Sequence, residues 1–329
     1  MRFKSLNWRL ISQLYFLLLC LTAGAFLFKA VLSVPELGTE AFAYRFPVLE
    51  AFLPISAMVG LKYWLFTGEY DPMHPAGLTI LLLAILSAFL LKRGFCSHIC
   101  PIGTVSEYAY KLRQHFIPRR LQLPALAVYI MKVPKYLLLG FLAFIVLVGM
   151  SAMDIVYFIR SPYNAISEIK MMSFFLDPSP LTIKIVLFLI VASLLLSNFW
   201  CRFLCPYGAL LSIFAMFSSV GVHRDAKRCI SCHSCEQACL NQLSITDRDK
   251  VESPDCTVCQ SCVSACPKGA LELRAAYGRQ PLSPSVYTWL LLGFFGAGIL
   301  LAMLSGHWQS AELAEYWAKY APMAGMIFH

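Results

Sequence analysis

Cysteines are the residues of this chain whose type and spacing are best suited to chemistry. The sequence contains 13 of them, and most lie in two runs that share the spacing C-x2-C-x2-C-x3-C. A ligand at every third residue lets a tight loop supply three thiolates to the corners of a metal–sulfur cube, while the following turn carries the fourth away. The spacing therefore predicts reduced, metal-bound thiols. The runs are Cys229, Cys232, Cys235 and Cys239, and Cys256, Cys259, Cys262 and Cys266.

The same spacing is typical of bacterial ferredoxins with two [4Fe-4S] clusters, in which three cysteines of one run join the last cysteine of the other. Two other chemistries compete with this prediction. Zinc also binds C-x2-C pairs, but two zinc knuckles explain two equal runs of four poorly. The haem-attachment pattern C-x-x-C-H occurs at 229–233, but its cysteines belong to the longer run. The predicted ligand sets are Cys229, Cys232, Cys235 and Cys266 for cluster 1, and Cys256, Cys259, Cys262 and Cys239 for cluster 2.

Four further cysteines form a second repeated pattern. An aromatic residue, Cys, three residues, Cys, Pro, one residue and Gly occur at 95–103 and again at 200–208. Cysteines four residues apart share one face of a helix, and the proline that follows cannot continue an ordinary helix interior. Because each copy follows an apolar segment, we expect each to bring a pair of thiols to the membrane boundary. The pairs are Cys96 with Cys100, and Cys201 with Cys205.

The duplication predicts that these two thiol pairs face each other across a pseudo-twofold axis. Four thiolates that meet there would hold one more iron–sulfur cluster. Two other interpretations stay open at this point. The pairs could be two redox-active dithiols, or they could be small residues at a close contact between helices.

Composition places the chain in a membrane. Hydrophobic residues make up 59% of the sequence and charged residues only 14%, which is too apolar for a soluble globular protein. Residues 46–66 are apolar but contain Glu50 and Lys62, so we interpret them as a partly embedded segment on the outer face. The remaining apolar runs predict five spanning helices, at 10–34, 76–91, 136–152, 183–200 and 286–304.

Charge then orients these spans. With the N-terminus inside, the inner segments hold 20 of the 27 Lys and Arg residues, as the positive-inside rule requires. The net charge of +9 is thus explained by lipid headgroups, and nucleic acid is not an expected partner. We expect a bacterial inner (cytoplasmic) membrane protein whose N-terminus and ferredoxin domain are cytoplasmic and whose C-terminus is periplasmic.

The expected fold is an α-helical integral membrane protein with about five spanning helices, a duplicated two-helix unit, and a small α+β two-cluster ferredoxin domain inserted before the last span. The expected divisions are 1–45 for the N-terminal span and outer loop, 46–120 and 121–222 for the two membrane repeats, 223–280 for the ferredoxin domain, and 281–329 for the last span and outer tail.

These motifs together resemble the polyferredoxin membrane proteins that include the NapH and MauN type quinol dehydrogenase components, the NosR regulators and the CcoG (RdxA, FixG) family. The resemblance covers roughly residues 75–305 and carries over to the twelve cysteines of the motifs. The sequence lacks the outer flavin domain of the NosR group and the long C-terminal domain of the CcoG group, so it looks most like the NapH type. The resemblance implies electron transfer between the quinone pool and a partner redox chain.

The expected function is therefore exchange of electrons between quinone and redox partner subunits, either ferredoxin-like proteins or c-type cytochromes. An ionisable group inside a membrane is a functional candidate, and His98, Glu50 and Glu168 are the candidates for handling protons beside a quinone. Two alternative functions remain. One is a cytoplasmic-facing copper reductase or assembly factor, as the CcoG resemblance implies, and the other is a cluster-bearing scaffold or sensor.

Overall fold

The computed structural model describes residues 7–117, 123–275 and 281–324. The expected domain boundaries at 120/121 and 280/281 lie outside the described residues. The chain forms two compact units, each taken by itself below: unit 1 comprises 1–17, 84–139 and 188–294, and unit 2 comprises 18–83, 140–187 and 295–329. Long helices contribute residues to both: α1 (Trp8–Leu37), α3 (Pro75–Leu91), α6 (Ala125–Phe144), α10 (Pro180–Leu195) and α14 (Pro284–Leu304).

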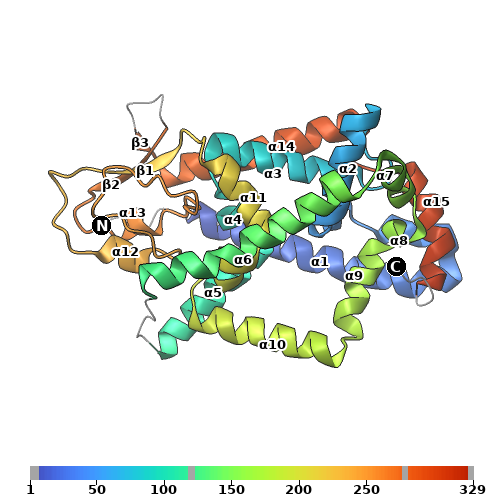
Figure 1. Ribbon diagram of the computed structural model, residues 1–329, viewed down its shortest axis with the longest axis horizontal. Helices are drawn as coiled ribbons and strands as arrows, with labels where there is room; N and C mark the ends of the chain where they lie inside the picture. The colour runs from blue at the N-terminus through green and yellow to red at the C-terminus, as the bar shows by residue number, and fades with distance from the viewer. Residues whose placement is uncertain (1–6, 118–122, 276–280, 325–329) are drawn as a thin grey trace. The chain divides into compact units, whose positions relative to one another are not determined.

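The other elements, labelled in Figure 1 where there is room, are shorter. Each belongs to one unit. Unit 1 contains the strands and the helices nearest the cysteine motifs: α4 (Gly94–His98), α5 (Pro101–Phe116), the π-helix η4 (Trp200–Leu204), α11 (Pro206–Ala215), β1 (Gly221–Arg224), α12 (Ser234–Ala238), α13 (Ser261–Ala265), β2 (Leu271–Arg274) and β3 (Pro281–Leu282). Unit 2 contains η1 (Gly38–Tyr44), η2 (Pro47–Phe52), α2 (Pro54–Thr67), the π-helix η3 (Ile145–Gly149), α7 (Ala152–Ile159), α8 (Pro162–Ala165), α9 (Ser167–Leu176), α15 (Ala311–Tyr320) and η5 (Ala321–Met323).

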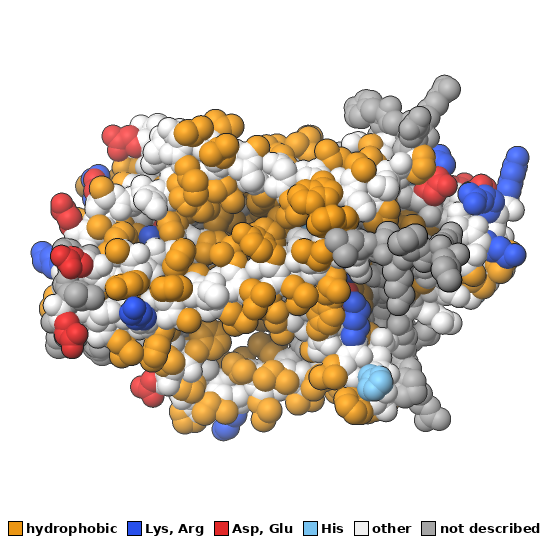
Figure 2. All heavy atoms as spheres, turned by 180° about the vertical axis from the view of Figure 1, so that it is seen from behind, with side chains coloured by type: hydrophobic (Ala, Val, Ile, Leu, Met, Phe, Trp, Pro, Cys, Tyr) orange, Lys and Arg blue, Asp and Glu red, His pale blue; other side chains and the backbone are white. Residues whose placement is uncertain are grey.

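The long helices confirm a helical membrane protein. Within the described residues, 8–33, 126–149 and 284–304 are long and apolar enough to cross a bilayer. Helices α9 and α10 pass the same test only as a pair bent by 81°, and α3, with 17 residues, is near the lower limit. Hydrophobic side chains are spread over much of the face shown in Figure 2, as expected for a surface that meets lipid. The five-span arrangement is part of the proposal below.

Helix α6 begins earlier than the apolar run that predicted it. The expected span began at 136, whereas the helix begins at Ala125 and carries Pro134 in its interior. Lys132 and Lys135, which the sequence placed in an inner loop, therefore lie within the helix. Both ammonium groups pair with the carboxylate of Asp255, so a polar partner compensates for the charge that interrupts the apolar run.

The segment 46–66 forms two short elements, η2 and α2. Pro54 begins α2, and Gly68, with φ of 76°, ends it. Lys62 is buried and its Nζ donates to the carbonyl oxygens of Val146 at 2.9 Å and Met150 at 2.8 Å. A lysine inside an apolar segment is thus satisfied by the free carbonyl groups at the end of η3.

The small sheet of unit 1 is antiparallel, in the order β1-β2-β3 (Figure 1). Gly221 pairs with Arg274 and Arg224 with Leu271. Both cysteine runs lie in the connection between β1 and β2, which also contains α12 and α13. A core that includes Val222, Ile245 and Leu273 packs beneath this connection, so the sheet and its core hold the two cysteine loops.

Unit 2 is organised around a buried guanidinium. Arg45 donates through Nε and Nη2 to the two carboxylate oxygens of Glu168, at 2.7 and 2.6 Å, and also binds Glu50. The backbone N–H of Gly77 donates to the second oxygen of Glu50 at 2.7 Å. Both glutamates are only 1% exposed. The network therefore joins η2, α9 and the first turn of α3.

Replacing Arg45 tests how strongly unit 2 depends on this network. Arg45→Gln would leave two buried carboxylates without their counter-charge, so we expect the free energy of unfolding to fall by about 3–5 kcal/mol. Arg160→Gln is the matched control, because Arg160 pairs at 3.7 Å with Glu312 and both side chains are nearly half exposed; its loss should cost about 0–1 kcal/mol. Thermal unfolding in detergent measures both, and equal shifts would contradict the assignment.

Candidate metal centres

The structure brings the eight cysteines of the two runs together in two separate cavities of unit 1. One cavity is lined by Cys229, Cys232, Cys235 and Cys266, beside Pro267. The other is lined by Cys239, Cys256, Cys259 and Cys262. In each, three cysteines of one run meet the last cysteine of the other. A four-thiol cavity of this kind has the donor set that an iron–sulfur cluster requires.

The two runs also have the same backbone. Residues at equivalent places in each run have positive φ: Ser231 and Val258 at 51° and 50°, and His233 and Gln260 at 54° and 61°. Such values are uncommon for residues other than glycine and mark functional loops. Cys239, which lacks the proline that follows Cys266, still shares its extended conformation, with ψ of 115° against 111°.

Backbone donors point at sulfur in both runs. The N–H of Leu243 donates to Cys239 Sγ at 3.5 Å, and the N–H of Ala270 donates to Cys266 Sγ at 3.3 Å. Hydrogen bonds of this kind stabilise a thiolate and tune a bound cluster. The donor set and its surroundings therefore fit the [4Fe-4S] clusters that the spacing predicts.

The two cavities differ in burial. Burial raises the pKa of Cys239 to about 12 and also raises the pKa of Cys262, so thiolates in this cavity need a bound cation to offset their charge. Hydrogen bonds from Ser231 and Ser234 lower the pKa values of Cys229 and Cys232, which lie at the surface. The first set is thus the less buried of the two, and Cys232 is its exposed member.

The duplicated membrane motif breaks at its second cysteine in both copies. The N–H of Cys100 donates to Phe95 O at 3.0 Å, and that of Cys205 donates to Trp200 O at 2.9 Å. Each cysteine then turns to an extended conformation, with ψ of 119° and 110°, and the next residue, a proline, begins a new helix. The expected break after each pair is therefore present.

The four thiols of this motif lie within electrostatic reach of one another. Within each copy, the motif glycine packs against the first cysteine. A Cβ atom at Gly103 would lie 2.2 Å from the carbonyl oxygen of Cys96, and one at Gly208 would lie 3.2 Å from that of Cys201. The motif glycine therefore lets the backbone of each copy turn back against the first cysteine of that copy. All thirteen cysteines are free thiols.

Two serines attach this motif to the second cysteine cavity. Ser97 Oγ donates to Thr257 O, and Ser197 Oγ donates to Leu240 O, both at 2.6 Å. Thr257 and Leu240 each directly follow a cysteine of that cavity. A further small cavity contains both Cys96 and Cys201 in its lining, together with Leu240 and Thr257. The membrane motif is therefore adjacent to the buried cysteine set.

A buried carboxylate joins the same two regions. Asp255, which precedes Cys256, pairs with Lys132 at 2.6 Å, Lys135 at 2.7 Å and Arg93 at 3.2 Å. Burial alone would raise the pKa of Asp255, but the three cations hold it well below its usual range. Arg93 Nη2 in turn lies 3.9 Å from Cys96 Sγ. One guanidinium thus contacts both Asp255 and a thiol of the membrane motif.

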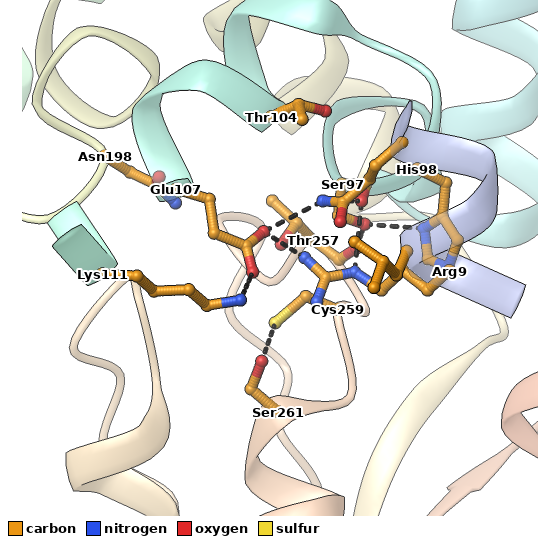
Figure 3. Close-up of polar contacts among 12 residues, drawn as sticks. Arg9, Ser97, His98, Thr104, Glu107, Lys111, Asn198, Thr257, Cys259 and Ser261 are labelled. Carbon is orange, nitrogen blue, oxygen red and sulfur yellow. Dashed lines mark hydrogen bonds and ion pairs between the residues drawn. The ribbon is translucent and has the colours of Figure 1, made fainter. Parts of the chain in front are cut away.

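The remaining predicted site residues fall in separate places. His98 is fully buried in unit 1, where its Nδ1 lies 3.2 Å from Gly94 O and its Nε2 has no partner among the described residues. Burial lowers its pKa to about 3, so the ring is neutral. Figure 3 shows it beside Arg9, which binds Glu107. Glu50 and Glu168 belong to the Arg45 network of unit 2.

Sequence reasoning missed the charged residues around the sulfurs. Asp255 adjoins a cysteine run, and Arg93 precedes the first membrane motif, but neither position carries a sequence signal that distinguishes it from an ordinary surface charge. Glu107, a helix residue buried between Arg9 and Lys111 (Figure 3), is a similar case. A lysine pair inside an apolar helix, Lys132 and Lys135, was the one available signal.

Known proteins share these motifs. Residues 73–122 match a family described as a 4Fe-4S binding domain, and residues 196–280 match one described as a 4Fe-4S dicluster domain. The chain is 35% identical over 335 residues to the protein named "Putative electron transport protein YccM" of Escherichia coli K12, covering 98% of this chain and 92% of that protein.

More distant relatives carry ferredoxin-type names. The ferredoxin-type protein NapH of Escherichia coli K12 is 26% identical over 201 residues, covering 56% of this chain and 63% of that protein. The methylamine utilization ferredoxin-type protein MauN of Paracoccus denitrificans is 29% identical over 174 residues, covering 50% of this chain and 54% of that protein. No solved structure matches the chain.

Alanine at the motif glycines tests the geometry of the four thiols. Gly103→Ala should lower thermal stability most, because the new Cβ would lie 2.2 Å from a backbone oxygen. Gly208→Ala should lower it less, because the nearest atom to the new Cβ, at 3.0 Å, belongs to the flexible end of Arg93. Gly140→Ala, where a Cβ meets nothing within 4 Å, should be neutral or stabilising by up to about 1 kcal/mol. Three equal melting temperatures would contradict this packing.

Proposed function

Because the chain belongs to the polyferredoxin membrane proteins of the NapH and MauN type, for which iron–sulfur electron transfer is the shared role, we propose that it exchanges electrons between the quinone pool and a partner redox chain. The observation that carries the proposal is the meeting of twelve cysteines in three adjoining groups within unit 1. A bound cluster supplies one-electron transfer at a potential that its surroundings set.

The ferredoxin part of the proposal assigns the two cavities. Cys229, Cys232, Cys235 and Cys266 hold cluster 1, and Cys239, Cys256, Cys259 and Cys262 hold cluster 2. The support is the pairing of three cysteines from one run with the last of the other in each cavity, and the shared backbone of the two runs. The exposed position of Cys232 makes cluster 1 the site of exchange with a soluble partner.

The membrane part assigns a third iron–sulfur cluster to Cys96, Cys100, Cys201 and Cys205. If the motif formed two redox-active dithiols, the two cysteines within each copy would have to approach each other. The two copies would not need to converge. The mutual approach of all four thiols, and the guanidinium of Arg93 beside Cys96 Sγ, favour a shared anionic group over two separate pairs. The match of residues 73–122 to a 4Fe-4S binding domain supports the same assignment.

The chain's own residues would fix the order of the centres. Ser97 and Ser197 hold the backbone next to Cys256 and Cys239, so the four-thiol site adjoins cluster 2. Cluster 2 is the buried centre and cluster 1 the exposed one. We therefore propose the sequence four-thiol site, cluster 2, cluster 1 and soluble partner, in either direction, with quinone as the electron donor or acceptor in the membrane. The five-span topology, with the cysteine runs on the cytoplasmic side of a bacterial inner membrane, is part of this proposal.

Reduction by a quinol tests the proposal. Purified protein kept free of oxygen and given an excess of a short-chain quinol analogue should show reduced clusters by EPR, at about the level that dithionite produces in the same preparation. Cupric ion added to the reduced protein distinguishes the metal-reductase alternative, because only that function requires stoichiometric reoxidation by copper. Clusters that dithionite reduces but quinol leaves oxidised would contradict the proposal.

A further inference from the structure

A groove in unit 2 stands outside everything described so far. It measures about 360 Å³ and is formed by the end of α2 and the loop that follows, the first turns of α3, and the end of α14. This volume lies within the range of small-molecule sites. The lining residues are Trp64, Gly68, Tyr70, Thr79, Leu82, Leu83, Leu301, Ala302, Ser305 and His307.

The groove has aromatic and aliphatic walls. The rings of Trp64 and Tyr70 meet at 5.5 Å between centroids, and Tyr70 meets His307 at 4.5 Å. Leu301 is 68% exposed and lies on α14, which is apolar and long enough to span a bilayer. A groove at the end of such a helix, between Trp and Tyr side chains, is at the level where a spanning protein meets the headgroups. An apolar ring with a lipid tail can reach it from the bilayer.

Two polar atoms at the groove are free to accept hydrogen bonds, one from His307 and one from Tyr70. The hydroxyl of Ser305 donates to Ala302 O at 3.3 Å, so it accepts from Nδ1–H of His307 at 2.8 Å. With the proton on Nδ1, Nε2 of His307 is an acceptor. The backbone N–H of His307 donates to Ala302 O at 2.8 Å, which folds the ring back over the end of α14.

A second acceptor comes from Tyr70. Thr79 Oγ1 donates to His307 O at 3.2 Å, so the hydroxyl of Tyr70 is the donor in its 2.8 Å contact with Thr79. The lone pairs of the phenolic oxygen therefore remain available to a ligand. Two acceptors between aromatic walls suit a ring that carries hydroxyl donors.

We propose that this groove binds the ring of a membrane quinol, with a quinol hydroxyl donating to His307 Nε2. The proposal rests on the proposed exchange with quinone and deepens it by naming the binding residues. A quinone has only acceptor oxygens and cannot donate to His307 Nε2, so this contact is made by the reduced form alone. Leu82, Leu83 and Leu301 contact the ring faces and the first part of the lipid tail.

Photolabelling tests the location. A short-chain azidoquinone, reduced to its quinol and photolysed with the protein in detergent, should label peptides that contain residues 64–83 or 301–307. Labelling confined to other peptides would overturn the proposal. Reduction of the clusters is measured on the same preparation, so the two proposals can fail separately. If quinol reduces the clusters but labels other peptides, only the assignment of the groove is wrong. If quinol labels the groove without reducing the clusters, only the electron-transfer role is wrong.

Two phenylalanine variants test the contact. His307→Phe keeps a ring against Tyr70 but removes Nε2, so the concentration of quinol that gives half-maximal labelling should rise about five- to tenfold, as the loss of one hydrogen bond implies. The concentration for the quinone should change little. His115→Phe, at an exposed histidine of α5, is the control and should leave both values unchanged. Equal quinol affinity in His307→Phe and the parent protein would overturn the proposal.

Discussion

The arrangement of the sulfurs depends on one buried carboxylate. Asp255 is 5% exposed, and an unpaired carboxylate at such burial would be strongly unfavourable. It is held by cations from two directions, Arg93 at the start of the first membrane motif and the lysines of α6. Because Asp255 directly precedes a cysteine of the buried set, these ion pairs position a cysteine run against the four-thiol motif.

Cations of the same region also offset the charge of the thiolates. Twelve thiolates in adjoining groups would repel one another, and burial adds to the cost of each charge. The Lys92 ammonium, which donates to Val251 O at 2.9 Å, lies near Cys256, and Arg93 lies beside Cys96. Positive charge is thus placed where cluster ligands gather. Lys92, Arg93 and Lys135 are all buried, so these basic residues offset thiolate charge from within the fold.

Both the cysteine runs and the membrane motifs are duplicated, and the two copies of each have the same local backbone geometry. The two cysteine runs share their positive-φ residues. The two membrane motifs share a wide final turn that ends in an extended cysteine. The contacts between the membrane motifs and the buried cysteine set correspond as well. Ser97 and Ser197 each donate to the carbonyl oxygen of the residue that follows a cysteine of that set. The repetition of geometry, not of sequence alone, supports the metal site proposed for the membrane thiols.

Sequence reasoning reached the motifs because their signals are local. Spacing predicted which cysteines meet, and a proline after each second membrane cysteine predicted the break there. The sequence did not predict ion pairs between residues that are far apart in the chain. Arg45 and Glu168 are separated by 123 positions, and Asp255 and Lys135 by 120. The start of α6 was misplaced because ionic partners allow lysines in an apolar helix, which hydropathy alone cannot show.

The central claim is that Cys96, Cys100, Cys201 and Cys205 hold an iron–sulfur cluster in addition to the two ferredoxin clusters. Iron and acid-labile sulfide per chain test it most directly, compared between the parent protein and a variant in which these four cysteines are serine. The account predicts about twelve irons in the parent and about eight in the variant, because each [4Fe-4S] cluster contributes four. About eight irons in both proteins would contradict it and make the membrane cysteines dithiols.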